Sequence, residues 1–587
     1  MKNYYLLLFA LFILGCTPPS KTTTAEKFAS VLEDYYQDGL ALYRINATYE
    51  GDVRYNDTLP NFLSPDFKAK EAAYFNTYKT AINAFDDKSL SAEDQLSKKI
   101  LNWELDLSIE GLQLKKELMP VDQMWTFQLS IGQLASGQSA QPFKTVKDYE
   151  NWLIRLDGYL EWMQSAETKM REGIVEQWVL PKALVKKVLP QLKTMTQPQL
   201  EENLFYSPIM HFPEDFSSED KERLTNAYAY KITEQLIPAY QQLHDFMAGP
   251  YMEAARETSG FNSLPGGEAY YAHAIKHYTT TTLSADAIHQ LGLSEVARIQ
   301  SEMEKVKTEL GFEGSLKDFF DHVRNLKSLM PFDAPQQVID HFKDIHTAMK
   351  PQVDQLFSLQ PKTAFEIRRT EAFRESSASA EYNSGSMDGT RPGIFYVPIP
   401  DVNSYNIFSD ESLFLHEAIP GHHFQISLQQ ENTGLPSFRK GLWYSAYGEG
   451  WALYAESLGK ELGLFTDPYQ YFGMLGAEIH RAVRLVVDTG LHAKGWMREQ
   501  AIQYSLDNEA ESEAAIESEI ERYMANPGQA LSYKIGQLKI RELRNKATQA
   551  LGDQFDVRVF HQKVLESGCL PLAFLEDKID HWIQDHK

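Results

Sequence analysis

One short segment restricts the fold and the chemistry of this chain more than any other. Three histidines and a glutamate fall within eight positions, His416 to His423, of an otherwise apolar run with the sequence LFLHEAIPGHHFQIS (413–427). Helical metallopeptidases hold zinc with a related pattern, in which two helical histidines bind the ion and a neighbouring Glu acts as base. The segment therefore predicts a metal site.

The spacing of these histidines departs from the usual four residues. The candidates for a second ligand, His422 and His423, lie six and seven residues after His416, with Pro420 and Gly421 before them. In an ideal helix His423 would lie about 10 Å further along the axis. Pro420 cannot donate a hydrogen bond to the carbonyl four residues earlier, and its ring displaces that carbonyl. We therefore expect a bulge or break that returns one histidine to His416; we favour His422 and keep His423 as the alternative.

Two glutamates complete the predicted site. Glu417 lies about a quarter turn from the first histidine, which suits a base that acts on metal-bound water. Glu449, in YGEGWALYAE (447–456), has glycine on both sides and is the candidate third ligand, because small neighbours allow a close approach. Glu456 follows seven residues later on the same helical face and is expected to orient a histidine. The alternative for the histidines is that they are buried, hydrogen-bonded caps of a broken helix. The alternative for Glu449 and Glu456 is a solvated acidic helix face.

Length and charge bound the remaining possibilities. The 587 residues contain 43% hydrophobic and 12% aromatic residues and no long internal linker, so we expect one large helical body or two closely packed lobes. We divide it into a helical N-terminal part (26–370) and a helical catalytic part (371–587), packed as one body. A formal net charge of −24 argues against nucleic acid as a partner. Nothing in the sequence fixes the oligomeric state.

The first residues predict export. Met1 to Asn3 precede an apolar run from Tyr4 to Leu14, and ILGC (13–16) resembles a bacterial lipobox. That resemblance implies a signal peptide over 1–15, cleavage before Cys16, lipidation of its thiol and a flexible tether over 16–25. We expect a lipid-anchored protein of the bacterial cell envelope that faces the periplasm or the exterior. The alternative is an ordinary cleaved signal with an incidental cysteine.

Two further segments carry candidate residues. The segment between 378 and 403 is rich in Gly and Pro and then in β-formers, which predicts a small strand or hairpin whose prolines favour a sheet edge. Arg391 and Tyr396 in it are candidates for substrate binding, Arg391 to a carboxylate, unless the segment is a surface turn. In the run 484–492, Asp488 is spaced to orient His492, which would donate to an oxyanion; a solvated charge ladder with Arg484 is the alternative.

Several long motifs carry a family resemblance. HEAIPGHHFQ, YGEGWALYAE, RAVRLVVDTGLHAKGW and PGQALSYKIGQLKI, with GDVRYND near the start and LSADAIHQLGLSEVARI in the middle, resemble the DUF 885 family of bacterial proteins, many of them lipoproteins. The family in turn resembles gluzincin-type zinc metallopeptidases, which implies hydrolysis of peptide bonds. By the same analogy, Tyr533 in the last of the four motifs binds the oxyanion through its hydroxyl, unless it is a core residue.

Together these observations predict a mostly α protein, a large multi-helix bundle of metallopeptidase type with a small β-hairpin or edge strand beside the active-site helix. The expected activity is zinc-dependent hydrolysis of peptide substrates, with His416, His422 or His423, and Glu449 as ligands. The alternative is a non-catalytic lipoprotein that binds peptide or metal. A serine hydrolase is disfavoured because no Gly-x-Ser-x-Gly lies near the histidines.

Overall fold

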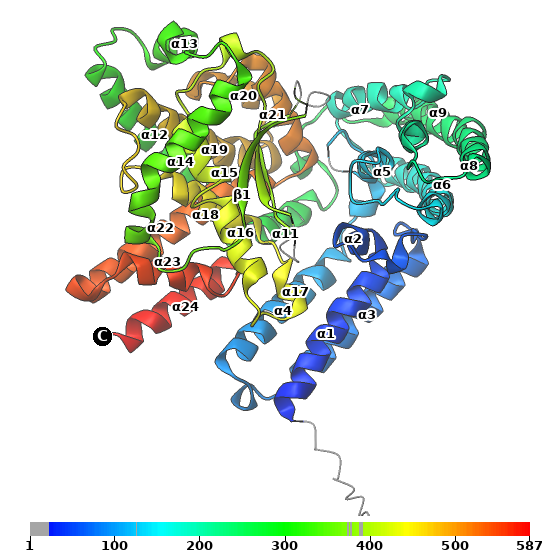
Figure 1. Ribbon diagram of the computed structural model, residues 1–587, viewed down its shortest axis with the longest axis horizontal. Coiled ribbons are helices and arrows are strands. Elements are labelled where there is room, and N and C mark those ends of the chain that lie inside the picture. Colours follow the sequence, from blue (N-terminus) through cyan, green and yellow to red (C-terminus); the bar gives the residue numbers. More distant parts are fainter. Residues whose placement is uncertain (1–22, 125, 372–374, 376–377, 387–390) are drawn as a thin grey trace, which may run out of the picture.

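The computed structural model describes residues 23–587 except 125, 372–374, 376–377 and 387–390. The described chain is mostly helical, as predicted, with one small sheet (Figure 1). The helices before the sheet are α1 Thr24–Leu42, α2 Arg44–Tyr49, α3 Pro65–Asn83, α4 Ala92–Gly111, α5 Phe127–Ala135, α6 Val146–Glu176, α7 Lys182–Thr194, α8 Ser218–Lys231, α9 Ile237–Phe246, α10 Met252–Ala254, α11 Gly267–Thr279, α12 Ala285–Glu309, α13 Leu316–Asn325 and α14 Pro335–Leu356.

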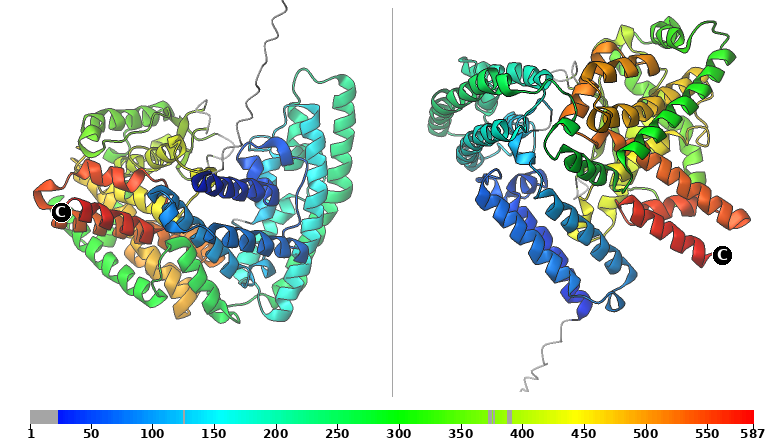
Figure 2. Two further views of the ribbon diagram at one scale, coloured as in Figure 1. Left: turned by 90° about the horizontal axis from the view of Figure 1, so that it is seen from below. Right: turned by 180° about the vertical axis from the view of Figure 1, so that it is seen from behind.

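The helices after the sheet hold the candidate site. They are α15 Asp410–Glu417, α16 His422–Glu431, α17 Ser437–Lys440, α18 Ser445–Glu456, α19 Pro468–Lys494, α20 Arg498–Asn508, α21 Glu513–Ala525, α22 Ser532–Leu551, α23 Val557–Leu565 and α24 Leu572–Asp585. Seen from below in Figure 2, α1, α3 and α4 (blue) lie between α5 to α9 (cyan) and this sheet-bearing part. The described residues contain no helix both long and apolar enough to cross a membrane.

Two helix pairs form the centre of the sheet-bearing part. The most extensive helix packing is between α12 and α19 and between α18 and α22. Gly450 of α18 and Gly536 of α22 allow the second pair to meet, because a Cβ on Gly450 would lie 2.4 Å from the Gly536 Cα. Lys534 of α22 is fully buried and connects the two pairs, with Nζ 2.9 Å from Glu295 of α12 and 2.7 Å from Glu478 of α19. One apolar cluster extends from Phe28 to Ile583 and connects both groups of helices.

The sheet corrects one expectation. Its strands are β1 Phe365–Arg369, β2 Glu381–Asn383 and β3 Gly393–Val397, in the order β1-β3-β2. β2 and β3 form the predicted antiparallel hairpin, but β3 is central rather than at an edge, because β1 pairs with its other side in parallel. The prolines flank β3 at 392, 398 and 400 and remove no donor from within it. The division proposed at 370/371 falls between the paired strands β1 and β3.

Candidate metal centre

The predicted break in the histidine segment is confirmed. α15 ends at Glu417 and α16 begins at His422, so four residues that include a cis Ile419-Pro420 bond separate the helices. A Cβ on Gly421 would lie 1.9 Å from the carbonyl oxygen of His416, so only glycine allows the loop to fold this closely against the end of α15. The indole Nε1–H of Trp451 donates to the Pro420 carbonyl at 2.7 Å and fixes the loop on α18.

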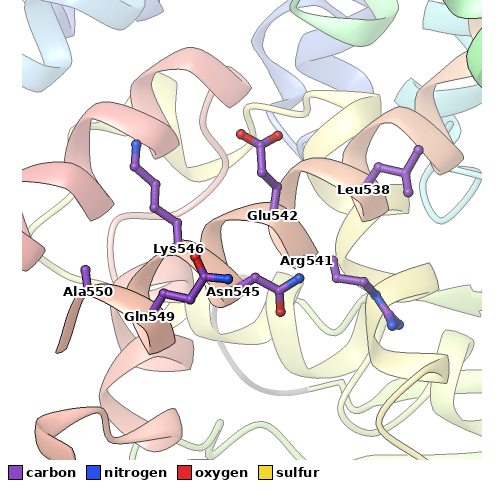
Figure 3. Close-up of a pocket in the computed structure, with 7 residues that line it drawn as sticks. All are labelled: Leu538, Arg541, Glu542, Asn545, Lys546, Gln549 and Ala550. Carbon is purple, nitrogen blue, oxygen red and sulfur yellow. The ribbon is translucent and has the colours of Figure 1, made fainter. Parts of the chain in front are cut away.

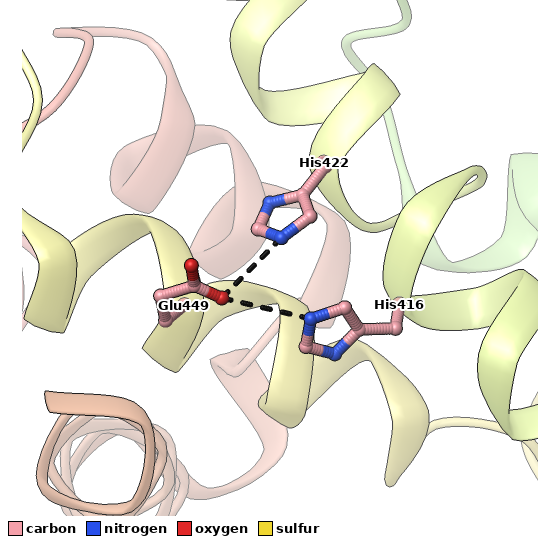
Figure 4. A group of neighbouring side chains, drawn as sticks. All are labelled: His416, His422 and Glu449. Atoms are coloured by element: carbon pink, nitrogen blue, oxygen red, sulfur yellow. Dashed lines mark ion pairs between the residues drawn. The ribbon is translucent and has the colours of Figure 1, made fainter. Parts of the chain in front are cut away.

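This loop brings three side chains from α15, α16 and α18 together (Figure 4). His416 Nε2 lies 3.6 Å and His422 Nε2 3.4 Å from the same oxygen, Glu449 Oε2. One donor atom from each residue lies within 4.8 Å of the others. Glu449 Oε2 is buried and has no hydrogen-bond partner among the described residues. Two nitrogens therefore surround an unsatisfied carboxylate oxygen, which is the arrangement of a cation site.

Two of the three distances suit a small divalent cation. Bonds of about 2.1 Å in a tetrahedron place neighbouring ligand atoms about 3.4 Å apart, close to the two observed nitrogen–oxygen distances. Two histidines and one carboxylate leave the fourth position of such a site open, as catalytic zinc sites do.

Glu456 holds one ligand in place. His416 Nδ1 donates to Glu456 Oε1 at 2.7 Å, which leaves Nε2 of that ring with a lone pair for a metal. The other oxygen, Oε2, accepts from the hydroxyl of Ser412 at 2.5 Å. The structure thus places Glu456 where the sequence predicted it. Ser412 was not predicted, although its position one helical turn before His416 is the signal that could have shown it. His422 Nδ1, in contrast, is buried without a hydrogen-bond partner in the described part of the chain.

Electrostatics at this site favour a positive charge. Burial would lower the pKa of His416, but the Glu449 carboxylate 3.6 Å away and the hydrogen bond to Glu456 outweigh it and raise the pKa to about 9. Burial would raise the pKa of Glu449, but the two imidazoles lower it well below its usual value. In the absence of a metal the group therefore holds protons, and a metal ion would replace them.

Glu417 follows His416 at the end of α15, and its carboxyl lies within electrostatic reach of both ligand histidines. It is half-buried, and burial raises the pKa of its carboxyl, with partial compensation from the charges of His416, His422 and Arg481. A raised pKa is the direction expected of a carboxyl group that takes up and releases a proton during catalysis. Arg481 was present in a quoted motif but was given no role from sequence.

Tyr533, near the start of α22, lies within electrostatic reach of Glu449. Burial and the neighbouring Glu449 charge raise the pKa of its hydroxyl, which keeps it protonated as a hydrogen-bond donor. Its ring lies under the guanidinium of Arg484, 4.7 Å from the ring centre. The structure therefore brings Tyr533 close to the ligand carboxylate.

His423 lies elsewhere. Its Nδ1 is 2.9 Å from the hydroxyl of Tyr382 in β2, and its ring packs against Phe365 of β1 at 4.9 Å. Because successive helical residues point about 100° apart, His422 turns toward Glu449 while His423 turns toward the sheet. As a ligand candidate, His423 is excluded by this geometry.

The expectation for Asp488 and His492 was wrong. Asp488 accepts hydrogen bonds from the hydroxyl of Tyr271 at 2.6 Å and the backbone N–H of Gly528, and does not orient His492. His492 accepts from the Phe261 N–H at Nδ1 and donates from Nε2 to the Tyr523 carbonyl. Burial lowers its pKa to about 3, so the ring is neutral and its one N–H is already used. Helical spacing placed the two residues on one face, but neighbouring helices supplied other partners.

Arg391 and Tyr396 are not brought to the three ligands. Arg391 is exposed, and its backbone N–H donates to Ser386 Oγ at 2.9 Å. Tyr396 lies on β3 on the face opposite Phe395, whose ring packs toward Phe414 of α15. Its substrate-binding role therefore has no geometric support. Cys16, the candidate for lipidation, lies outside the described residues.

A cavity of about 400 Å³ adjoins the site. Its lining includes Ser412, His416, Glu456, His480 and Arg481. A second, more open hollow of about 760 Å³ lies over α22, and it is lined from that helix alone, by Leu538, Arg541, Glu542, Asn545, Lys546, Gln549 and Ala550 (Figure 3). No member of the candidate site borders this second hollow, so substrate contacts are sought in the first.

The fold and site define a mostly helical protein in which two histidines and a glutamate form a group whose spacing would allow a cation to bind. The chain belongs to the family described as "Bacterial protein of unknown function (DUF885)", which matches residues 45–579. No curated protein matches the sequence.

Two solved structures share this fold. A putative lipoprotein from Colwellia psychrerythraea is 29% identical, with a TM-score of 0.87 over 96% of this chain and 100% of its own. A putative lipoprotein of unknown function from Shewanella oneidensis is 19% identical, with a TM-score of 0.74 over 94% of this chain and 99% of its own. The second likeness concerns the fold alone.

Proposed function

We propose that the protein is a zinc-dependent peptidase. The observation that carries this proposal is the convergence of His416 Nε2 and His422 Nε2 on the unpartnered oxygen of Glu449. The same three residue types bind zinc in gluzincin-type peptidases, which the sequence motifs resemble. When bound here, zinc would lower the pKa of a coordinated water to about 7 and polarise the substrate carbonyl.

The surrounding residues have separate roles in this proposal. Glu417 accepts a proton from the attacking water and delivers it to the leaving amine as the C–N bond breaks. Tyr533 donates a hydrogen bond to the carbonyl oxygen as negative charge develops on it. Glu456 keeps His416 in the orientation that presents Nε2. A base beside the ligands is needed for hydrolysis and is not needed for binding alone.

The test compares wild type with Glu417→Gln in a digest of a peptide library, after zinc loading. We expect cleavage by wild type, loss of at least about a hundredfold of the rate in the variant, and equal zinc content in both. Glu513→Gln, an exposed residue of α21, is the matched control and should cleave as wild type does. If wild type holds zinc and cleaves nothing, the protein is a non-catalytic binder.

We further propose that the protein is a lipoprotein of the bacterial cell envelope. The lipobox-like ILGC sequence supports this location, as does the description of the Colwellia psychrerythraea neighbour as a putative lipoprotein. Labelled palmitate should enter the protein in cells and should be lost from Cys16→Ser. Label that persists in Cys16→Ser would contradict the anchor.

A further inference from the structure

Arg481 of α19 lies beside the metal group without a carboxylate partner. Its Nη1 donates to the Ala477 carbonyl of its own helix at 3.2 Å, while its Nε is buried and has no acceptor in the described part of the chain. Among the described residues no Asp or Glu forms an ion pair with it. The side chain lines the 400 Å³ cavity together with His416 and Glu456.

Arg484, one turn later, has a second unused donor. Only 7% of the residue is exposed, and its Nη1 is buried without an acceptor among the described residues. Its other nitrogens are occupied, Nε by the hydroxyl of Tyr523 and Nη2 by Glu519, both at 3.0 Å. Both guanidinium groups lie over the ring of Tyr533, at 6.0 Å and 4.7 Å from its centre. The unused donors thus flank the tyrosine that faces Glu449.

Buried donors without acceptors are costly, at about 1 to 3 kcal/mol each, and native proteins contain few of them. A guanidinium group has a planar fork of donors that matches a carboxylate in two parallel hydrogen bonds. Arg484 already pairs with Glu519, whereas Arg481 forms no ion pair with a described Asp or Glu. A carboxylate that enters the cavity would supply the acceptor that Arg481, which lines it, does not have.

We propose that Arg481, assisted by Arg484, binds the C-terminal carboxylate of a peptide substrate, so that the protein removes residues from the C-terminal end. This inference rests on the proposed peptidase function. Arg481 lines the cavity together with His416, and its charge acts on the Glu417 carboxylate, so a carboxylate bound by Arg481 lies near a metal ligand and within electrostatic reach of the proposed base.

Binding is measured by calorimetry on the zinc-loaded Glu417→Gln protein, which does not consume the ligand. The probes are acetyl-trialanine, its C-terminal amide, and acetyl-Ala-Ala-Glu-amide, which carries its carboxylate on a side chain. We expect acetyl-trialanine to bind at least about tenfold tighter than either amide, as a charge-assisted bidentate pair requires. Adding Arg481→Met should reduce this preference to below about twofold, and Arg481→Lys should retain part of it.

Arg558→Met, which removes an exposed arginine of α23, is the control for net charge and should keep the full preference. Equal binding of acid and amide, no measurable binding of the acid, or a preference unchanged by Arg481→Met would overturn the inference. Tight binding of the glutamyl amide would assign the site to side-chain carboxylates instead. If wild type cleaves no peptide but still prefers the acid, the peptidase proposal fails and the carboxylate site stands. If wild type cleaves peptides but shows no preference for the acid, the peptidase proposal stands and the carboxylate site fails.

Discussion

Removal of the Glu456 carboxylate tests how the protein orients its metal ligand. Both oxygens of this buried side chain are used, one by His416 Nδ1 at 2.7 Å and one by the Ser412 hydroxyl at 2.5 Å. Glu456→Gln keeps the shape and an acceptor for the imidazole N–H but loses the negative charge. Glu456→Ala loses the acceptor as well, so the ring can turn and expose the wrong nitrogen.

Loss of such hydrogen-bond partners lowers metal affinity by about ten- to a hundredfold. Because Gln keeps the hydrogen-bond acceptor and loses only the negative charge, we expect zinc binding by Glu456→Gln to be about tenfold weaker, or about 1.4 kcal/mol. We expect about a hundredfold for Glu456→Ala. Competition against a fluorescent zinc chelator of known affinity measures both, and a melting curve of each metal-free variant separates lost affinity from lost folding.

Ser412→Ala is the graded control for this series. It removes only the outer hydrogen bond and leaves the imidazole–carboxylate contact intact, so its affinity should fall by less than in Glu456→Gln. If Glu456→Ala binds zinc as tightly as wild type, the reasoning that Glu456 orients the ligand is refuted.

Three other predictions concern the site and its support. Gly421→Ala places a Cβ 1.9 Å from a carbonyl oxygen of α15 and should lower the free energy of unfolding by about 3 kcal/mol. The control Gly249→Ala, whose Cβ meets no atom within 4 Å, should be neutral. Chemical denaturation measures both variants, and equal stability of the two would contradict the packing argument. Burial raises the pKa of Asp488 to about 7 in the folded state, so the native protein keeps a proton that the unfolded chain releases at lower pH. The free energy of unfolding from this group is greatest below about pH 4 and should fall by about 4 kcal/mol as pH rises from there through 7. Asp488→Asn should remove this fall, and a parallel pH profile would refute the assignment. His422→Ala should abolish zinc binding in a metal assay while His423→Ala keeps one zinc per chain; the reverse result would show that the ligand assignment is wrong.

The sequence predicted the elements of the site better than their contacts. Pro420 lacks a donor for a helical hydrogen bond, and this local property was enough to predict the break before His422. Helical periodicity likewise placed Glu456 on the face of Glu449. Both features depend on covalent structure and on spacing within one helix.

Contacts between separate segments could not be read in this way. Spacing allowed Asp488 to reach His492, but Tyr271 and Gly528, which are far away in sequence, occupy its oxygens. The prolines around β3 predicted an edge strand, but β1, a segment more than twenty residues earlier, pairs with its other side. Tertiary packing decided both outcomes.

The central claim is that His416, His422 and Glu449 share one metal ion. Anomalous diffraction at the zinc absorption edge, on crystals of the purified protein grown with zinc, tests it most directly. We predict one peak about 2.1 Å from both Nε2 atoms and from a carboxylate oxygen of Glu449. A map without a peak at this position, or with its zinc peak on other residues, would contradict the claim.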